Sequence, residues 1–164
     1  MANNVNKTNA SRLLDKAKIK YELIPYVVDE KDLSATHICE QLGENIKQVF
    51  KTLVLHGDKT GYFVCVIPGD DEVDLKKAAK ASGNKKVAMI TVKELLPLTG
   101  YIRGGCSPIG MKKALPTYFE QSIVDYDYVY VSAGQRGLQL KLSGSELVRY
   151  VRGTLAHVIV TESN

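Results

Sequence analysis

Several features that define whole classes of protein are missing from these 164 residues. The chain has no tryptophan, and its three cysteines are far apart and form no Cys-x-x-Cys pair. The histidines are equally scattered, so neither a zinc site nor a disulfide framework is indicated. No apolar run approaches the roughly 18 residues that a membrane-spanning helix requires. We expect one domain over residues 1–164, with reduced thiols and with no metal or cofactor.

The N-terminal region also lacks the basic start, apolar stretch and cleavage site of a secretory signal, so we expect a cytoplasmic protein. The net charge of +4 is small. The basic residues are nevertheless grouped, and the groups are Lys76, Lys77, Lys80, Lys85 and Lys86; Arg103, Lys112 and Lys113; and Arg136 and Lys141. Such groups suit a phosphate backbone, or they are the solvated faces of helices and turns. Charge alone leaves both interpretations open.

The hydrophobic pattern predicts a mixed α/β chain with a largely antiparallel sheet. Helices are predicted where capping residues precede apolar stripes, namely after Asn9, after Ser34, over 75–81 after Asp74, from Thr91 to a stop at Pro97 and Gly100, and after Ser143. Strands are predicted over 21–28, 49–55, 62–67, 85–90, 128–132, 138–142 and 157–160. The runs 49–55 and 62–67 read as a β-hairpin. Residues 100–116 are punctuated by glycine and proline and read as a long loop.

Lys51 is the most informative side chain. Strand alternation places it on the same face as Val49, Leu53 and Leu55. A lysine among aliphatic neighbours must find an anion, a polar cleft or a route to water, because an unpaired buried ammonium is too costly. Lys51 is therefore either a functional cation or a lysine that reaches water or a carboxylate from the strand end.

Two adjacent glycines, Gly104 and Gly105, lie within the long loop. Without side chains, their amide groups can approach a ligand carbonyl or phosphate, although a plain turn needs glycines too. Pro108 would stiffen this loop. The segment has neither the Walker nor the dinucleotide-binding spacing.

Cys106 follows the glycines, but no sequence feature supplies it with a base, and a lone thiol is more often a small buried apolar group. Ser132 ends a predicted strand, where its hydroxyl either holds a ligand or stabilises the following turn. It is not part of a Gly-x-Ser-x-Gly elbow, which argues against a serine hydrolase. Tyr26 can stack on a nucleobase or simply pack.

Several stretches, in their order and spacing, resemble the YbaK/EbsC family, the relatives of the editing domain inserted in bacterial prolyl-tRNA synthetases. The matching stretches are 48–53 (QVFKTL), 74–77 (DLKK), 83–87 (GNKKV), 99–101 (TGY), 104–113 (GGCSPIGMKK) and 131–138 (VSAGQRGL). No single motif is decisive, but the ordered set is specific and covers nearly the whole chain. The resemblance implies one compact mixed α/β domain with a curved, barrel-like, largely antiparallel sheet flanked by helices.

Carried over by position, the resemblance implies roles for individual residues. Lys51 matches the family's essential lysine, and Gly104 and Pro108 match its Gly-x-x-x-Pro loop, whose backbone faces the substrate ester. Together with Gly104, the amide of Gly105 would stabilise charge on the carbonyl oxygen. Ser132 matches a polar residue of the pocket and Tyr26 an aromatic residue near it.

Gln139 is a departure, because the YbaK branch usually carries aspartate at this position. An amide supplies no negative charge to a substrate ammonium, so this change questions strict cysteine preference more than deacylation. We place Gln139 among the substrate-binding residues.

The activity implied by the resemblance is trans-editing: hydrolysis of the aminoacyl ester of mischarged tRNA, chiefly Cys-tRNA(Pro). The cysteinyl thiol would attack its own carbonyl, so that no metal, cofactor or protein nucleophile is needed. The implied partners are the 3′ end of the tRNA and, transiently, prolyl-tRNA synthetase. Two alternatives remain: a deacylase for Ala-tRNA(Pro) or another small amino acid that uses water, and a non-catalytic module that binds tRNA or a synthetase.

Overall fold

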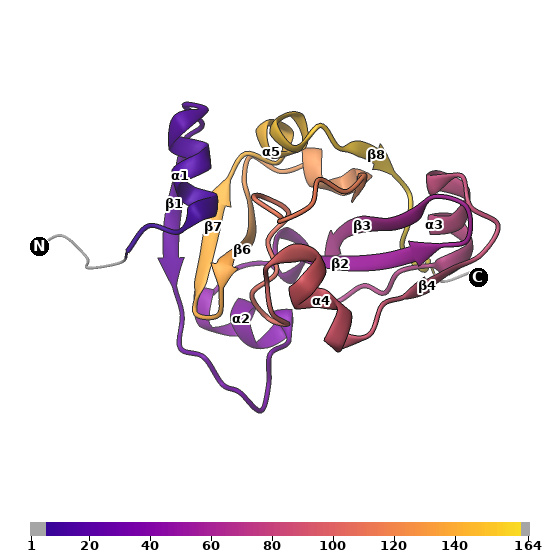
Figure 1. Cartoon of the computed structure of the whole chain (residues 1–164). Helices are drawn as coiled ribbons and strands as arrows, with labels where there is room; N and C mark the ends of the chain where they lie inside the picture. Colours follow the sequence, from indigo (N-terminus) through magenta and orange to yellow (C-terminus); the bar gives the residue numbers. More distant parts are fainter. Residues whose placement is uncertain (1–5, 162–164) are drawn as a thin grey trace, which may run out of the picture.

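Two β-sheets with helices around them make up residues 6–161, the part of the chain that this computed structural model describes (Figure 1). The smaller sheet is antiparallel and has the order β1 (Tyr21–Pro25), β7 (Leu138–Leu142) and β6 (Val129–Gln135). The larger sheet has the order β4 (Val87–Met89), β2 (Phe50–Gly57), β3 (Gly61–Pro68), β5 (Thr117–Glu120) and β8 (Thr154–Ala156). The predicted mixed α/β class is confirmed.

The sheet arrangement differs in part from the expected single curved sheet. The two sheets are not closed into a barrel, and they meet where Val49 forms an isolated parallel bridge with Tyr130. The predicted hairpin is present as β2 and β3, which pair from Phe50↔Pro68 to Gly57↔Gly61. In contrast, β5 pairs in parallel with both β3 and β8. Parallel pairs join segments that are distant in the sequence, which local alternation does not reveal.

The helices begin largely where capping residues predict them. They are α1 (Asn9–Lys16), α2 (Ala35–Leu42), α3 (Leu75–Ser82), α4 (Val92–Thr99) and α5 (Gly144–Val151), with short 3-10 helices at Ile46–Gln48 and Gln121–Val124. Ser34, Asp74 and Ser143 accept hydrogen bonds from the first-turn amides, as predicted. For α1, however, the cap is Thr8 and not Asn9, because the Thr8 hydroxyl accepts from the Ser11 amide.

The strands β1 and β4 are shorter than the predicted runs 21–28 and 85–90, and three other features also differ from the prediction. The last strand is Thr154–Ala156, whereas within 157–160 only Ile159 forms an isolated bridge, to Val73. Pro97 lies inside α4, in its last turn, and the helix ends at Gly100. The strand β5 was not predicted, because a strand of four residues offers too little alternation to be distinguished from a loop.

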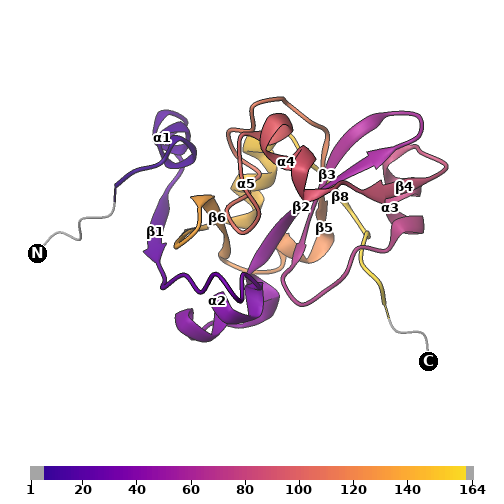
Figure 2. The same cartoon turned by 60° about the horizontal axis from the view of Figure 1, so that its bottom comes forward.

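The hairpin of β2 and β3 separates two apolar clusters. On one face Phe50, Val54, Val64 and Val66 join the main core with β6, β7 and α5. On the other face a smaller cluster includes Leu55, Phe63, Cys65 and Ile67 with Ala78 of α3. Both layers are visible in Figures 1 and 2, where α3 lies on the opposite side of the hairpin from the smaller sheet. Within residues 6–161, no helix has the length and apolarity that a membrane crossing requires.

Candidate active site

A cavity of about 540 Å³ opens beside β2, where the two sheets meet. Its walls come from the segment before α2, from the N-terminal half of β2, from the start of α4, from the glycine loop and from the paired strands β6 and β7. The polar and charged residues that line it include Lys31, Asp32, Lys51, Thr52, Thr91, Arg103, Ser132 and Gln139. The volume is within the range of small-molecule sites.

The cavity follows an open strand edge. Strand β2 pairs with β3 along its whole length but with β4 only at Leu55–Gly57. The Val54 carbonyl points away from β3, since it accepts from the Ile90 amide at 3.3 Å. In an antiparallel pair the outward direction recurs every second residue, so the backbone N–H and C=O of Thr52 also point to this edge. Residues 49–54 all line the cavity, so residues of both strand faces contribute to its wall.

Lys51 is half-buried in this wall. Within residues 6–161 its ammonium has no hydrogen bond and no ion pair within 4.0 Å. Burial lowers the pKa of Lys51 below its ordinary value, although the nearby carboxylates of Glu72, Asp71 and Asp70 act in the opposite direction. The result is a cation that faces the cavity and still has its full hydrogen-bonding capacity.

A second lysine pairs with two of these three carboxylates, Asp70 and Asp71. The ammonium of Lys47 lies 3.1 Å from Asp70 and 3.4 Å from Asp71. Its hydrogen bond to Asp70 raises the pKa of Lys47, the opposite of the change at Lys51. Two lysines four residues apart therefore have different roles. Lys47 pairs with Asp70 and Asp71, which we call the acidic turn, and Lys51 is available to a ligand.

The two glycines of the loop are not equivalent. The Gly105 amide already donates to the Ile102 carbonyl at 2.9 Å. The Gly104 amide has no acceptor within the described residues, and Gly104 lines the cavity whereas Gly105 does not. An added Cβ at Gly105 would lie 3.0 Å from the Cα of Gln135, so this glycine is required for packing against the turn between β6 and β7. Of these two glycines, only Gly104 has an amide without an acceptor in the described part of the chain.

Ser132 and Gln139 are directly opposite each other on β6 and β7, so both side chains reach the same end of the cavity. Ser132 is 8% exposed, and its oxygen accepts from the Gly134 amide at 3.1 Å, which leaves its O–H available as a donor. Gln139 is 3% exposed, and its Oε1 has no partner within the described residues. The Thr52 hydroxyl is likewise buried and unpartnered. Buried polar atoms without partners are rare, and in a cavity wall they indicate a ligand.

Cys106 also lines the cavity, but burial raises its pKa to about 12. The thiolate, not the thiol, is the effective nucleophile, so Cys106 remains protonated and unreactive at neutral pH. The preference for a small buried group at this position, which the sequence suggested, agrees with its 8% exposure.

The structure thus brings four predicted site residues, Lys51, Gly104, Ser132 and Gln139, into one cavity. Three others lie outside its lining. Gly105 packs against the β6–β7 turn, Pro108 is buried within the loop, and Tyr26 donates its amide to the Gly137 carbonyl beside that turn. Their positions support the loop and the turn, so any contact with substrate stays a prediction.

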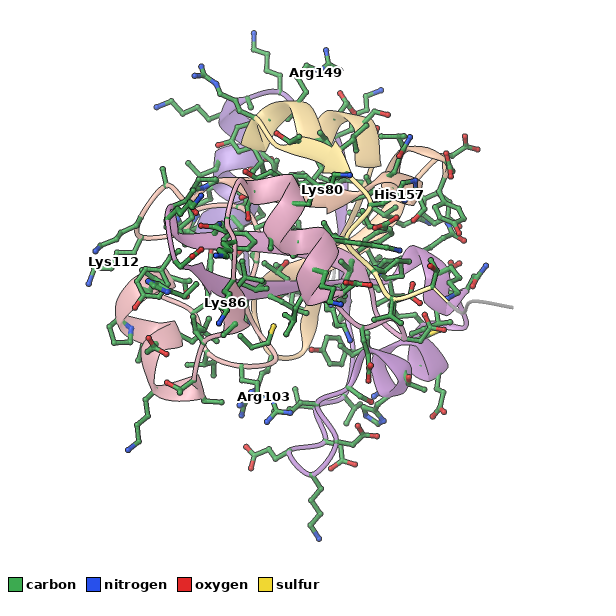
Figure 3. The ribbon with its side chains drawn as sticks, turned by 90° about the vertical axis from the view of Figure 1, so that its right-hand side faces the viewer. Lys80, Lys86, Arg103, Lys112, Arg149 and His157 are labelled. Carbon is green, nitrogen blue, oxygen red and sulfur yellow. The ribbon has the colours of Figure 1, made fainter. Side chains whose placement is uncertain are left out.

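Sequence reasoning missed Thr52 and Lys31, which also line the cavity, and named Arg103 only as a member of a basic group. For Thr52 a signal existed, because it is the polar residue between Phe50 and Val54 on its strand face, as Lys51 is between aliphatic residues on the other. For Arg103 and Lys31, exposed side chains in loops, local sequence offers no comparable signal. Figure 3 shows Arg103 in the lower half of the view, below Lys86 and Lys80.

Among residues 6–161, no group of three or more histidine, cysteine, aspartate or glutamate side chains is arranged to hold a metal ion. The groups that converge on the cavity are instead a cation, an amide donor, a hydroxyl and two unpartnered acceptors. Such a set can bind a carbonyl group, a ribose or phosphate and an ammonium group at the same time.

Comparisons with known proteins agree with this chemistry. A family model of the aminoacyl-tRNA editing domain matches residues 29–150. EbsC of Enterococcus faecalis, whose name describes a Cys-tRNA(Pro)/Cys-tRNA(Cys) deacylase, is 48% identical over 156 residues, 95% of each chain. A proline–tRNA ligase of Fervidobacterium nodosum is 29% identical over 79 residues, which are 48% of this chain and 14% of the ligase.

A crystal structure described as a trans-editing enzyme for prolyl-tRNA synthetase superposes with a TM-score of 0.80 at 22% identity, and it covers 95% of this chain and 100% of that chain. This likeness confirms the fold, and the family match and the EbsC identity confirm the resemblance seen in the motifs. The chain belongs to the aminoacyl-tRNA editing domain family, in its YbaK/EbsC group.

Proposed function

We propose that this protein is a free-standing deacylase that hydrolyses the ester of mischarged tRNA, with Cys-tRNA(Pro) as its principal substrate. The observation that carries the proposal is the convergence of the unpaired Lys51 ammonium and the free Gly104 amide on one cavity with unpartnered acceptors. The name of the EbsC relative supports the same amino acid.

Each wall of the cavity has a part in this reaction. The Gly104 amide donates to the ester carbonyl oxygen, where negative charge develops in the transition state. Lys51 binds the terminal ribose or its phosphate and so holds the ester against that amide. The buried oxygens of Gln139 and Thr52 accept hydrogen bonds from the substrate ammonium, with the hydroxyl of Ser132 beside them.

The nucleophile comes from the substrate. The cysteinyl sulfur attacks its own carbonyl carbon, the bond from that carbon to the ribose oxygen breaks, and the thiol proton passes to the leaving oxygen. The product is a cyclic thiolactone that water then opens to cysteine. Holding sulfur and carbonyl in a reactive pose supplies the acceleration. The protonated state of Cys106 is consistent with this route, because the chain's own thiol in the cavity is not activated.

Gln139 bears on the choice of amino acid. An amide oxygen binds an ammonium more weakly than a carboxylate does, because it lacks the full charge. We propose that binding here relies less on the ammonium and more on the size of the amino acid and its thiol. A water-dependent deacylase for Ala-tRNA(Pro) is the alternative that this substitution favours.

A prolyl-tRNA synthetase benefits from a separate editing enzyme, because its own pocket discriminates weakly between amino acids of similar size. Discriminating one altered group in an apolar pocket yields only about 1–3 kcal/mol, so a second hydrolytic site is required. The matching region within a proline–tRNA ligase supports prolyl-tRNA synthetase as the transient partner and tRNA(Pro) as the carrier. This role would place the protein in the cytoplasm with translation.

The test is release of the amino acid from Cys-tRNA(Pro), Ala-tRNA(Pro) and Pro-tRNA(Pro), each corrected for spontaneous hydrolysis. We expect fast release of cysteine, slow release of alanine and none of proline. A further substrate, 2-aminobutyryl-tRNA(Pro), has nearly the size of the cysteinyl form but no thiol, and we expect it to resist. Equal rates for the cysteinyl and aminobutyryl forms would exclude the thiol-assisted step, and no release above background would exclude deacylation.

A further inference from the structure

Arg136, at the tip of the turn between β6 and β7, lies across the glycine loop. Its Nε–H donates to the Arg103 carbonyl at 2.9 Å. An added Cβ at Gly104 would lie 3.3 Å from this Nε and 3.5 Å from the Cγ of Arg136, which shows how closely the side chain covers the loop. Within residues 6–161, Arg136 makes no ion pair.

The hydrogen bond to Arg103 determines the direction of the Gly104 amide. The Arg103 carbonyl and the Gly104 N–H belong to one planar trans peptide, in which these two groups point in opposite directions. With its carbonyl bound by Arg136, the peptide directs the Gly104 N–H away from Arg136. This is the N–H that has no acceptor in the described part of the chain.

The conformation of Gly104 makes such a restraint necessary. Its φ is +86°, in the left-handed region, and glycine is the residue with the greatest backbone freedom. The neighbouring Arg103 is exposed, and the three atoms nearest to an added Cβ at Gly104 are two of Arg136 and the Cδ1 of Leu33, at 3.5 Å. The turn that carries Arg136 also connects the strands that present Ser132 and Gln139. Arg136 therefore links the loop wall of the cavity to the strand wall.

We propose that Arg136 is a positioning residue, which holds the Arg103–Gly104 peptide so that the Gly104 amide faces the ester carbonyl oxygen. This inference rests on the proposed deacylation. It assigns the guanidinium a geometric role through Nε, which differs from the general attraction of a cation for a phosphate backbone. Lysine has no donor at the Nε position, so it preserves the charge but not the geometry.

The experiment compares Arg136→Lys and Arg136→Ala with the same changes at Arg149. Arg149 is an exposed arginine on α5, at the opposite end of the view from Arg103 (Figure 3). We expect both Arg136 variants to lower kcat for the charged tRNA by about 10- to 100-fold, because a small misplacement of a catalytic group has this effect. We expect KM to change by less than about twofold, and the Arg149 variants to match the wild type.

A second readout does not depend on activity. The hydrogen bond from the Gly105 amide to the Ile102 carbonyl lies in the same turn. We therefore expect hydrogen exchange of the Gly105 amide to accelerate in Arg136→Lys, while the exchange of the β2 and β3 amides is unchanged. Unchanged β2 and β3 exchange also shows that the variant is folded. Wild-type kcat in Arg136→Lys, or a change in KM alone, would overturn the inference. Arg136 would then act only through its positive charge, as a general attraction for the phosphate backbone.

Failure of the inference and failure of the proposed function are distinguishable. If the wild type releases no amino acid, the proposed function fails, and the Gly105 exchange still reports whether Arg136 orders the loop. If the wild type is active but Gly105 exchange in Arg136→Lys equals that of the wild type, Arg136 does not position the loop and only this inference fails.

Discussion

Gln139 on β7 and Glu120 on β5 are buried to the same extent, at 3% exposure each, but their environments are opposite. Both oxygens of Glu120 have partners: Oε1 accepts from the Val158 amide at 2.7 Å, and Oε2 lies 3.0 Å from Nδ1 of His157. The Gln139 Oε1 has none within residues 6–161. The carboxylate fastens the C-terminal segment to the sheet, whereas the amide oxygen has no partner within residues 6–161 and belongs to a residue of the cavity wall.

The same contrast separates the two lysines near the acidic turn. Lys47 is paired with Asp70 and Asp71, and Lys51 faces the cavity unpaired. Burial depth and residue type therefore do not distinguish the polar groups that pack within the fold from those of the cavity wall. Whether the hydrogen bonds of a group are satisfied does distinguish them. A fold tolerates a buried polar group without a partner only where another interaction compensates the cost.

The largest effect is expected at Lys51. Lys51→Ala removes the cation that holds the ribose or phosphate, and we expect deacylation of Cys-tRNA(Pro) to fall by about 100-fold or more. Lys47→Ala is the matched control, four residues earlier, and should retain most of the activity. Single-turnover release of cysteine measures both. Near-normal turnover by Lys51→Ala, in a protein with an unchanged circular dichroism spectrum, would remove Lys51 from the mechanism.

The same substitution at Gln139 and at Glu120 should have opposite consequences. Gln139→Leu removes an unpartnered acceptor, so we expect stability to be unchanged or to rise, while cysteine release falls by roughly 10-fold. Glu120→Leu leaves the buried Val158 amide without its acceptor, and we expect a loss of about 2–3 kcal/mol with little change in kcat. Denaturant unfolding measures the stability of each variant, and the deacylation assay measures its rate of cysteine release. If both variants lost stability equally, the distinction between the two sites would be wrong.

The pH dependence of kcat/KM should reveal the protonation state of Lys51. An ammonium is charged below its pKa, and burial lowers this pKa, so the charge is lost at a lower pH than the ordinary 10.5. We therefore expect kcat/KM to decline on the alkaline side before that pH, after subtraction of spontaneous ester hydrolysis. In Lys51→Arg, whose guanidinium stays charged, the decline should be absent. A profile that is flat in the wild type would contradict the lowered pKa.

The smallest effect is expected at Cys106. With its pKa raised to about 12, the thiol contributes no nucleophile, so Cys106→Ser should deacylate within about twofold of the wild type. The comparison of rates is made at neutral pH on freshly reduced protein. Loss of activity in a folded Cys106→Ser protein would reinstate the chain's own thiol as a reactant.

Local sequence predicted the elements well because their signals are local. Ser34, Asp74 and Ser143 cap helices through bonds that span three residues, and the alternation of β2 and β3 specifies a hairpin with a short connection. The strand β5 was not predicted, because its four residues offer too little alternation to be distinguished from a loop. The cap of α1 was displaced by one residue, which is the usual uncertainty of a helix end.

The candidate site was predictable only where a residue conflicts with its own surroundings. Lys51 among aliphatic residues on a strand and two consecutive glycines in a loop are such conflicts. Thr52 was assigned no role in advance and Arg136 only a place in a basic group, because their significance comes from what they contact or fail to contact. Gly104 and Gly105 look alike in the sequence, and one hydrogen bond, from Gly105 to Ile102, separates them.

By itself, the sequence determined the mixed α/β class, the family and the choice of Lys51 as the candidate cation, because periodicity, caps and ordered motifs are properties of neighbouring residues. Only the tertiary structure decided which polar groups are satisfied. That depends on contacts between segments that are far apart in the chain, such as Arg136 with the Arg103 carbonyl or Lys47 with the acidic turn. A donor or acceptor is free only if no other segment pairs with it in the folded chain. A local sequence pattern therefore cannot predict which groups are free.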